Sequence, residues 1–221
     1  MVAPALSWAA DKDEVPSLLD HFLLGCHDLD SGIAFVEENT GVRAAVGGVH
    51  PGRGTRNALL SLGERQYLEI IAPDPRQPGA ADTLGLRKLT EPRLVGWAAH
   101  PGDLDSFAKK LREVGVAFEG LTPGSRARPD GRVLHWKTVN LADDRHGLLP
   151  FFIEWSADSA HPSTDAPKGC TLDNFEAMSA NPDELTQVLQ RIGIDLPVER
   201  SDRTRLRAQI TGPKSDLRLS S

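Results

Sequence analysis

The stretch DLDSFAKKLREVGV, residues 103–116, carries the signals for both ends of a short helix. Asp103 is a residue type that caps free backbone N–H groups at a helix start. Apolar residues follow at i, i+3, i+4 and i+7 spacing, from Leu104 to Leu111, and Gly115 ends the pattern. This spacing predicts a helix with one buried face.

The same signal occurs twice more in the chain. One helix is predicted between the cap Asp28 and the stop at Gly41. Another follows Asn181, where Pro182 at the first helical position and Glu184 form a capping box.

Each predicted helix follows a short strand-like run and ends in Gly plus a β-branched residue. The runs lie at 19–22, 94–97 and 172–175. Because the order of signals recurs, the sequence predicts repeated supersecondary units.

Strand-like segments complete the first two units. After the first helix they lie at 43–49, 56–62 and 66–72, and after the second at 116–122, 132–141 and 149–156. Pro123-Gly124 and 129–131 are predicted turns between the second set. The tight turns predict a mostly antiparallel sheet, and the fold class is α+β.

The chain therefore divides into two complete modules with additions at both ends. The predicted division is an N-terminal extension at 1–17, a first βαβββ module at 18–92, a second at 93–160, and a partial βαββ unit with a tail at 161–221.

Composition excludes several classes of protein. The chain has 221 residues, and its 25 Lys and Arg against 31 Asp and Glu give a net charge of -6 without a dense basic cluster, which argues against nucleic acid as a partner. Two cysteines cannot form a disulfide framework. No apolar run approaches the ~20 residues of a membrane span, so we expect a cytoplasmic protein with no membrane partner.

Three segments carry a resemblance to a known family. They are HPGRGTRN at 50–57, PGSR at 123–126 and LPFFIEW at 149–155. Over residues 18–160 the chain resembles the glyoxalase-like domain family of the vicinal oxygen chelate superfamily. The resemblance implies that the paired modules form a cupped sheet around a metal or ligand site.

The resemblance also implies a set of metal ligands on the first and last strands of each module. With 67–72 aligned to 152–157, the set is His21, Glu69 and Glu154. Gly96 falls at the fourth place and cannot coordinate through a side chain. A divalent zinc, nickel, manganese or iron ion with three protein ligands would fit this set, and His50 or His135 could join it. His21 could instead be a hydrogen-bonded core histidine, and the two Glu could face solvent.

The implied chemistry is that of a metal-dependent lyase or isomerase, similar to lactoylglutathione lyase, acting on a small oxygenated substrate. Glu69 or Glu154 would move a proton beside a metal-bound carbonyl. The alternative is a metal-free protein that sequesters a small molecule in the same cup. An extradiol dioxygenase is less favoured, because the second-module His is missing.

Polar and aromatic residues near the implied cup are candidates for substrate binding, since guanidinium groups can hold an anionic substrate group. They are His50, Arg53, Arg56, Asn57, Arg126, His135 and Trp136. The loop that carries Arg53 could instead be a plain hairpin connection, and the second-module residues could belong to an exposed edge strand. The C-terminal unit is expected to cover a sheet edge or to mediate a homodimer.

Overall fold

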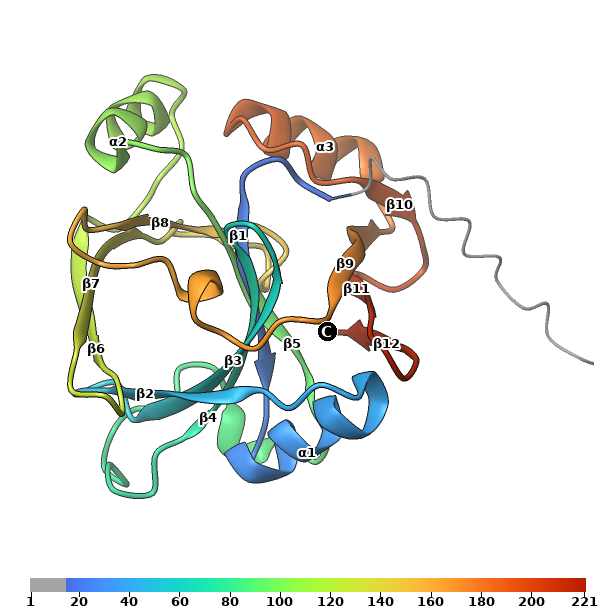
Figure 1. Cartoon of the computed structure of the whole chain (residues 1–221). Coiled ribbons are helices and arrows are strands. Elements are labelled where there is room, and N and C mark those ends of the chain that lie inside the picture. The colour runs from blue at the N-terminus through green and yellow to red at the C-terminus, as the bar shows by residue number, and fades with distance from the viewer. Residues whose placement is uncertain (1–14) are drawn as a thin grey trace, which may run out of the picture.

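The computed structural model describes residues 15–221, which form a barrel with a smaller sheet packed beside it (Figure 1). Residues 1–14 of the predicted N-terminal extension lie outside the described residues. The strands of the barrel are β1 (Leu19–Gly25), β2 (Ala45–His50), β3 (Thr55–Gly63), β4 (Gln66–Pro73), β5 (Arg93–Ala99), β6 (Thr122–Ala127), β7 (Val133–Val139) and β8 (Phe151–Trp155). The smaller sheet contains β9 (Thr171–Ser179), β10 (Val198–Arg200), β11 (Arg205–Thr211) and β12 (Asp216–Ser220).

The strand order in the barrel is β1-β4-β3-β2-β6-β7-β8-β5. Each module contributes four neighbouring strands, and within each module the first strand pairs in parallel with the last. The modules join along the antiparallel pair β1 and β5 and along β2 and β6, where Val49 and Ala127 form the whole ladder. The predicted α+β fold with two βαβββ modules is confirmed, and the cup closes into a barrel.

The ladder between β1 and β5 relates the two modules by an approximate two-fold axis. His21 pairs with Ala98, Phe22 with Trp97, and Leu23 with Gly96. In this register Phe22 and Trp97 are equivalent, and so are His21 and Gly96. The equivalence of His21 with Gly96 agrees with the spacing of the two helix starts.

The helices are α1 (Leu29–Thr40), α2 (Leu104–Glu113) and α3 (Pro182–Arg191), with short 3-10 turns at Leu86–Lys88 and Pro162–Thr164. Asp28 and Asp103 act as the predicted caps, because their carboxylates accept hydrogen bonds from the Ser31 and Ser106 N–H groups.

The predicted capping box at α3 is wrong. The helix begins at Pro182 as expected, but the Asn181 side chain makes no capping hydrogen bond. The Glu184 carboxylate instead accepts a hydrogen bond from Arg145 Nη1 at 3.0 Å, which places it against the loop after β7.

The predicted strand at 116–122 and the turn at Pro123-Gly124 are also wrong. Strand β6 runs through both residues, with Pro123 opposite Lys137 and Gly124 opposite Trp136. Proline is tolerated on a strand that lacks a continuous second neighbour, as β6 does. A Cβ on Gly124 would lie 2.4 Å from the Trp136 ring, so glycine lets the indole lie across the strand.

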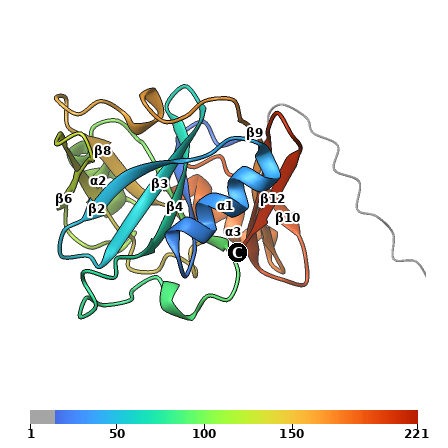
Figure 2. The same cartoon turned by 60° about the horizontal axis from the view of Figure 1, so that its bottom comes forward.

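The C-terminal unit packs on the outside of the barrel of its own chain (Figure 2). Its sheet has the order β10-β9-β11-β12, which is one strand more than the predicted βαββ unit. Phe175 on β9 stacks on Phe22 at 5.3 Å between ring centroids and meets the edge of Trp97 at 5.3 Å. Phe22 and Trp97, which are equivalent in the two modules, thus both contact Phe175 of the C-terminal unit.

Alternation along the strands separates two environments. Phe22, Leu68 and Phe152 belong to the main apolar core, which also includes the buried faces of the three helices. Their neighbours in sequence point to the opposite face of the sheet, which is the barrel interior. Within residues 15–221, no helix is both long enough and apolar enough to cross a membrane.

Candidate active site

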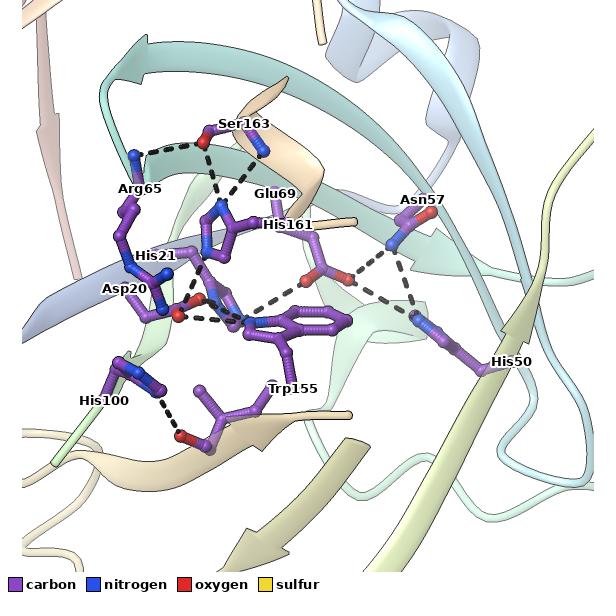
Figure 3. A network of polar contacts seen from close by, with 11 residues as sticks. Asp20, His21, His50, Asn57, Arg65, Glu69, His100, Trp155, His161 and Ser163 are labelled. Atoms are coloured by element: carbon purple, nitrogen blue, oxygen red, sulfur yellow. Dashed lines mark hydrogen bonds and ion pairs between the residues drawn. The ribbon is translucent and has the colours of Figure 1, made fainter. Parts of the chain in front are cut away.

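The polar residues of the barrel interior gather around Glu69 on β4 (Figure 3). The Glu69 side chain is 8% exposed, and its Oε1 accepts a hydrogen bond from Asn57 Nδ2 at 2.8 Å. His21 Nε2 lies 3.5 Å from Oε2, and His50 Nε2 lies 3.8 Å from Oε1. A carboxylate therefore lies between two imidazoles in a largely water-excluded interior.

The side chain of His21 is oriented by Asp20. His21 Nδ1 lies 2.6 Å from Asp20 Oδ1, so Nε2 is the nitrogen that faces Glu69. Adjacent strand residues normally point to opposite faces, but the β1 ladder shifts between Leu19 and His21. This β-bulge brings Asp20 and His21 together.

Asp20 links the site to the segment that follows β8. Its Oδ2 lies 3.2 Å from His161 Nε2 and accepts a hydrogen bond from Trp155 Nε1 at 3.2 Å. Burial opposes ionisation of Asp20, but the hydrogen bonds and charges of His161 and His21 outweigh it and lower the pKa of the carboxyl well below its ordinary value.

Electrostatics around Glu69 favour its charged form. Burial raises its pKa, but the neighbouring His50, His21 and Arg126 and the Asn57 hydrogen bond lower it more, so the net shift is downward. Burial lowers the pKa of His50 from 6.5 to about 4, so this imidazole is neutral at neutral pH. The site can therefore hold an ionised carboxylate ready to accept a proton.

Four of the predicted substrate-binding residues share this interior. His50 and Asn57 contact Glu69. The centroid of the Trp136 ring lies 6.2 Å from that of the His50 ring. The charge of Arg126 lowers the pKa of Glu69. Arg126 is only 2% exposed.

The other three predicted residues lie elsewhere. Arg56 points to the start of α1, where its Nη2 lies 3.4 Å from Asp28 Oδ2. Arg53 lies in the exposed turn after β2, and His135 is exposed on β7.

Glu154 is separated from the other two predicted metal ligands. Its Oε2 accepts a hydrogen bond from Leu104 N at the start of α2, and its Oε1 lies 3.4 Å from Lys137 Nζ. Its neighbours Ile153 and Trp155 pack in the interior, so Glu154 points to the outer face of the sheet.

The strand register explains this separation. Leu23 pairs with Glu69 in the first module, and its equivalent Ala98 pairs with Phe151 in the second. Phe151 is thus the counterpart of Glu69, and its ring meets the edge of His21 at 5.6 Å between centroids.

The predicted metal set does not fit this geometry. Gly96 and Phe151 stand at the second-module positions, and neither has a ligating side chain. Across residues 15–221, no three His, Cys, Asp or Glu residues are grouped so that they could hold a metal ion. We therefore derive no catalytic step through a metal.

Sequence reasoning missed Asp20, His161, Tyr67 and Trp155. Tyr67 stacks on His21 at 4.5 Å between ring centroids, and Trp155 packs 5.3 Å from Trp136. Tyr67 and Trp155 could have been found from the alternation of strand residues. Tyr67 lies two residues from Glu69, and Trp155 two residues from Ile153, so each shares the interior face of its strand. A bulge at Asp20 and a contact from residue 161 leave no such signal.

Residues 19–193 match the glyoxalase-like domain family. The chain belongs to that family, and the match extends into the C-terminal unit.

One solved structure supports the same fold. A hypothetical protein from Staphylococcus aureus is 18% identical, with a TM-score of 0.64 over 91% of this chain and 84% of that one. Methylmalonyl-CoA epimerases from Streptomyces coelicolor, with 2-nitronate-propionyl-CoA bound, and from Mycobacterium tuberculosis are 24% and 23% identical, with TM-scores of 0.47 each. They cover 66% and 65% of this chain and 99% and 91% of those chains. A search of curated proteins found no match.

Proposed function

We propose that this protein is an enzyme that moves a proton next to the carbonyl or hydroxyl carbon of a small oxygenated substrate bound inside the barrel. The observation that carries the proposal is the buried carboxylate of Glu69, which has a lowered pKa and faces His21 Nε2 at 3.5 Å. A general base of this kind must be charged before it accepts a proton, and a water-poor interior strengthens its interactions.

Two residues have distinct roles in this proposal. Glu69 takes the proton from carbon, which leaves an enediolate on the substrate and a carboxylic acid on Glu69. His21 Nε2, which faces Glu69, hydrogen-bonds the substrate oxygen where the negative charge develops. Return of a proton from Glu69 to the same carbon restores the substrate, with the proton exchanged for one from solvent, so atoms and charges balance.

Asp20 and His161 support His21. Asp20 faces His21 Nδ1 with one oxygen and His161 Nε2 with the other. A carboxylate in this position fixes the orientation of the His21 ring, with Nε2 toward Glu69.

The test is exchange of substrate protons with solvent deuterium, followed by proton NMR. The probes are glycolaldehyde, dihydroxyacetone, lactate and the hemithioacetal of methylglyoxal. Wild-type protein without added metal is expected to exchange the proton of at least one probe, and Glu69→Gln to lower that rate by about 10²–10⁴-fold. Equal rates in the two proteins would refute the role of Glu69.

A second candidate is a metal-free protein that sequesters a small molecule. The aromatic rings of Tyr67, Trp136 and Trp155 around the same interior favour it, since such rings bind a ligand's apolar surface. Saturable binding of a probe without any exchange would select this candidate. Homodimer formation and a cytoplasmic location stay predictions from the sequence.

A further inference from the structure

Arg126 is a buried cation of the barrel interior, and its charge lowers the pKa of Glu69. It is 2% exposed, and its Nε has no hydrogen-bond partner. Within residues 15–221 the structure gives Arg126 no ion pair. Taking an unpaired charge out of water is costly, so an anion from outside the chain would complete this site.

Asn57 carries a second buried atom without a hydrogen-bond partner, and this atom is an acceptor, whereas Arg126 Nε is a donor. The residue is fully buried, and its Nδ2 donates to Glu69 Oε1 at 2.8 Å. An ionised carboxylate can only accept, so this contact fixes which end of the amide is the donor. Asn57 Oδ1 is left buried without a hydrogen-bond partner, and it can be satisfied only by a donor.

Gly47 on β2 shows that the Arg126 guanidinium and Asn57 Oδ1 lie close to one another. A Cβ built on Gly47 would lie 2.5 Å from Asn57 Oδ1 and 3.2 Å from Arg126 Nη1. No side-chain carbon fits at this point without displacing them, so glycine lets Asn57 Oδ1 and the Arg126 guanidinium lie against the β2 backbone.

The same place lies beside the least-paired seam of the barrel. Strands β2 and β6, which carry Gly47 and Arg126, share the single ladder pair of Val49 with Ala127. Few hydrogen bonds have to open here for a small molecule to reach the interior.

We infer that Arg126 and Asn57 form a subsite for a small 2-hydroxy carboxylate. The Arg126 guanidinium binds the carboxylate, and Asn57 Oδ1 accepts the hydrogen bond from the hydroxyl group. Because Asn57 also holds Glu69, the carbon between carboxylate and hydroxyl lies next to the base. This inference rests on the proposed function and names its substrate class.

The test is binding measured by calorimetry on the full chain. The probes are lactate, propionate, lactamide and inorganic phosphate. Lactate is expected to bind, and lactamide, which lacks the charge, to bind about 10- to 100-fold more weakly, as expected for losing a hydrogen bond to a charged group. Propionate, which lacks the hydroxyl, is also expected to bind more weakly than lactate.

Two variants separate this subsite from a general loss of folding. Arg126→Met is expected to weaken lactate binding by about 10- to 100-fold. It should also raise the melting temperature of ligand-free protein, because it removes a buried unpaired charge. The matched control is Arg128→Met, because Arg128 is a nearby arginine whose Nη1 already pairs with Asp165 at 2.8 Å. This variant should bind lactate like wild type.

The outcomes distinguish this inference from the proposed function. Equal binding of lactate and lactamide, no saturable binding of lactate, or phosphate binding more tightly than lactate would overturn the subsite. Lactate binding that depends on Arg126, without proton exchange in wild type, would uphold the subsite and refute the proton-transfer function. Lactate binding retained in Glu69→Gln, with exchange lost, would uphold both.

Discussion

The two modules of the barrel share a backbone and differ in chemistry. The interior of the first carries His21, Glu69 and Asn57, whereas the equivalents of His21 and Glu69 in the second are Gly96 and Phe151. The second module adds aromatic walls and one cation. In this account the first module supplies the reacting groups, and the second supplies the wall and the anchor for the substrate.

The difference also shows in how charges are held. In the first module Asp20 is buried against two imidazoles and an indole N–H. The corresponding polar contacts of the second module, from Lys137 to Asp105 and Glu154, lie on the outer surface. Buried pairs are costly to break, and exposed pairs contribute little.

The largest effect on stability is therefore expected from Asp20→Asn. Removing the charge leaves His21 and His161 without their shared carboxylate and should lower the free energy of unfolding by about 3–5 kcal/mol. The control is Lys137→Met in the second module, with an expected loss of at most about 1 kcal/mol. Urea denaturation measures both, and similar losses would contradict the contrast between the modules.

Acid should weaken the first module through His50. Its pKa falls from 6.5 to about 4 on folding, so between these pH values the unfolded chain binds more protons than the folded one. The contribution of His50 to the free energy of unfolding is fully present above pH 6.5. It is lost as the pH falls toward 4, and the loss is on the order of 3 kcal/mol. The pKa values of Asp20 and Glu69 are also lowered, and their contributions are lost at still lower pH.

The measurement is the free energy of unfolding as a function of pH for wild type and His50→Gln. The variant should lose most of the slope between pH 4 and 6.5. An unchanged slope would show that another group causes the acid sensitivity.

The smallest effect on stability is expected from Glu154→Gln. The Glu154 carboxylate accepts a hydrogen bond from the first turn of α2. A negative charge there interacts favourably with the positive end of the helix dipole. Its loss should cost about 0.5–1 kcal/mol. Thermal unfolding measures this, and a loss as large as that of Asp20→Asn would mean that Glu154 has a buried role.

Much of the fold could be predicted from the sequence, because helix caps and apolar periodicity are local signals. Asp28 and Asp103 fix the spacing of the modules, and this spacing correctly makes Gly96 the equivalent of His21 in the repeat. The strand at β6 was missed, because Pro123-Gly124 is a turn signal that the pairing with β7 overrides.

Only the part of the site that lies in the first module could be predicted from the sequence. Glu69 and Glu154 both lie in apolar strands and align by eye, but Glu154 lies three residues beyond Phe151, the counterpart of Glu69. An odd shift along a strand moves a side chain to the other face. Strand register depends on ladder pairing between distant segments, which local patterns do not determine.

The most direct test of this account compares proton exchange in Glu69→Gln and Glu154→Gln on a probe that wild type turns over. Glu69→Gln is expected to lose about 10²–10⁴-fold in exchange rate, while Glu154→Gln is expected to exchange like wild type. Equal losses in the two variants, or a loss in Glu154→Gln alone, would contradict the claim that the first module supplies the reacting groups.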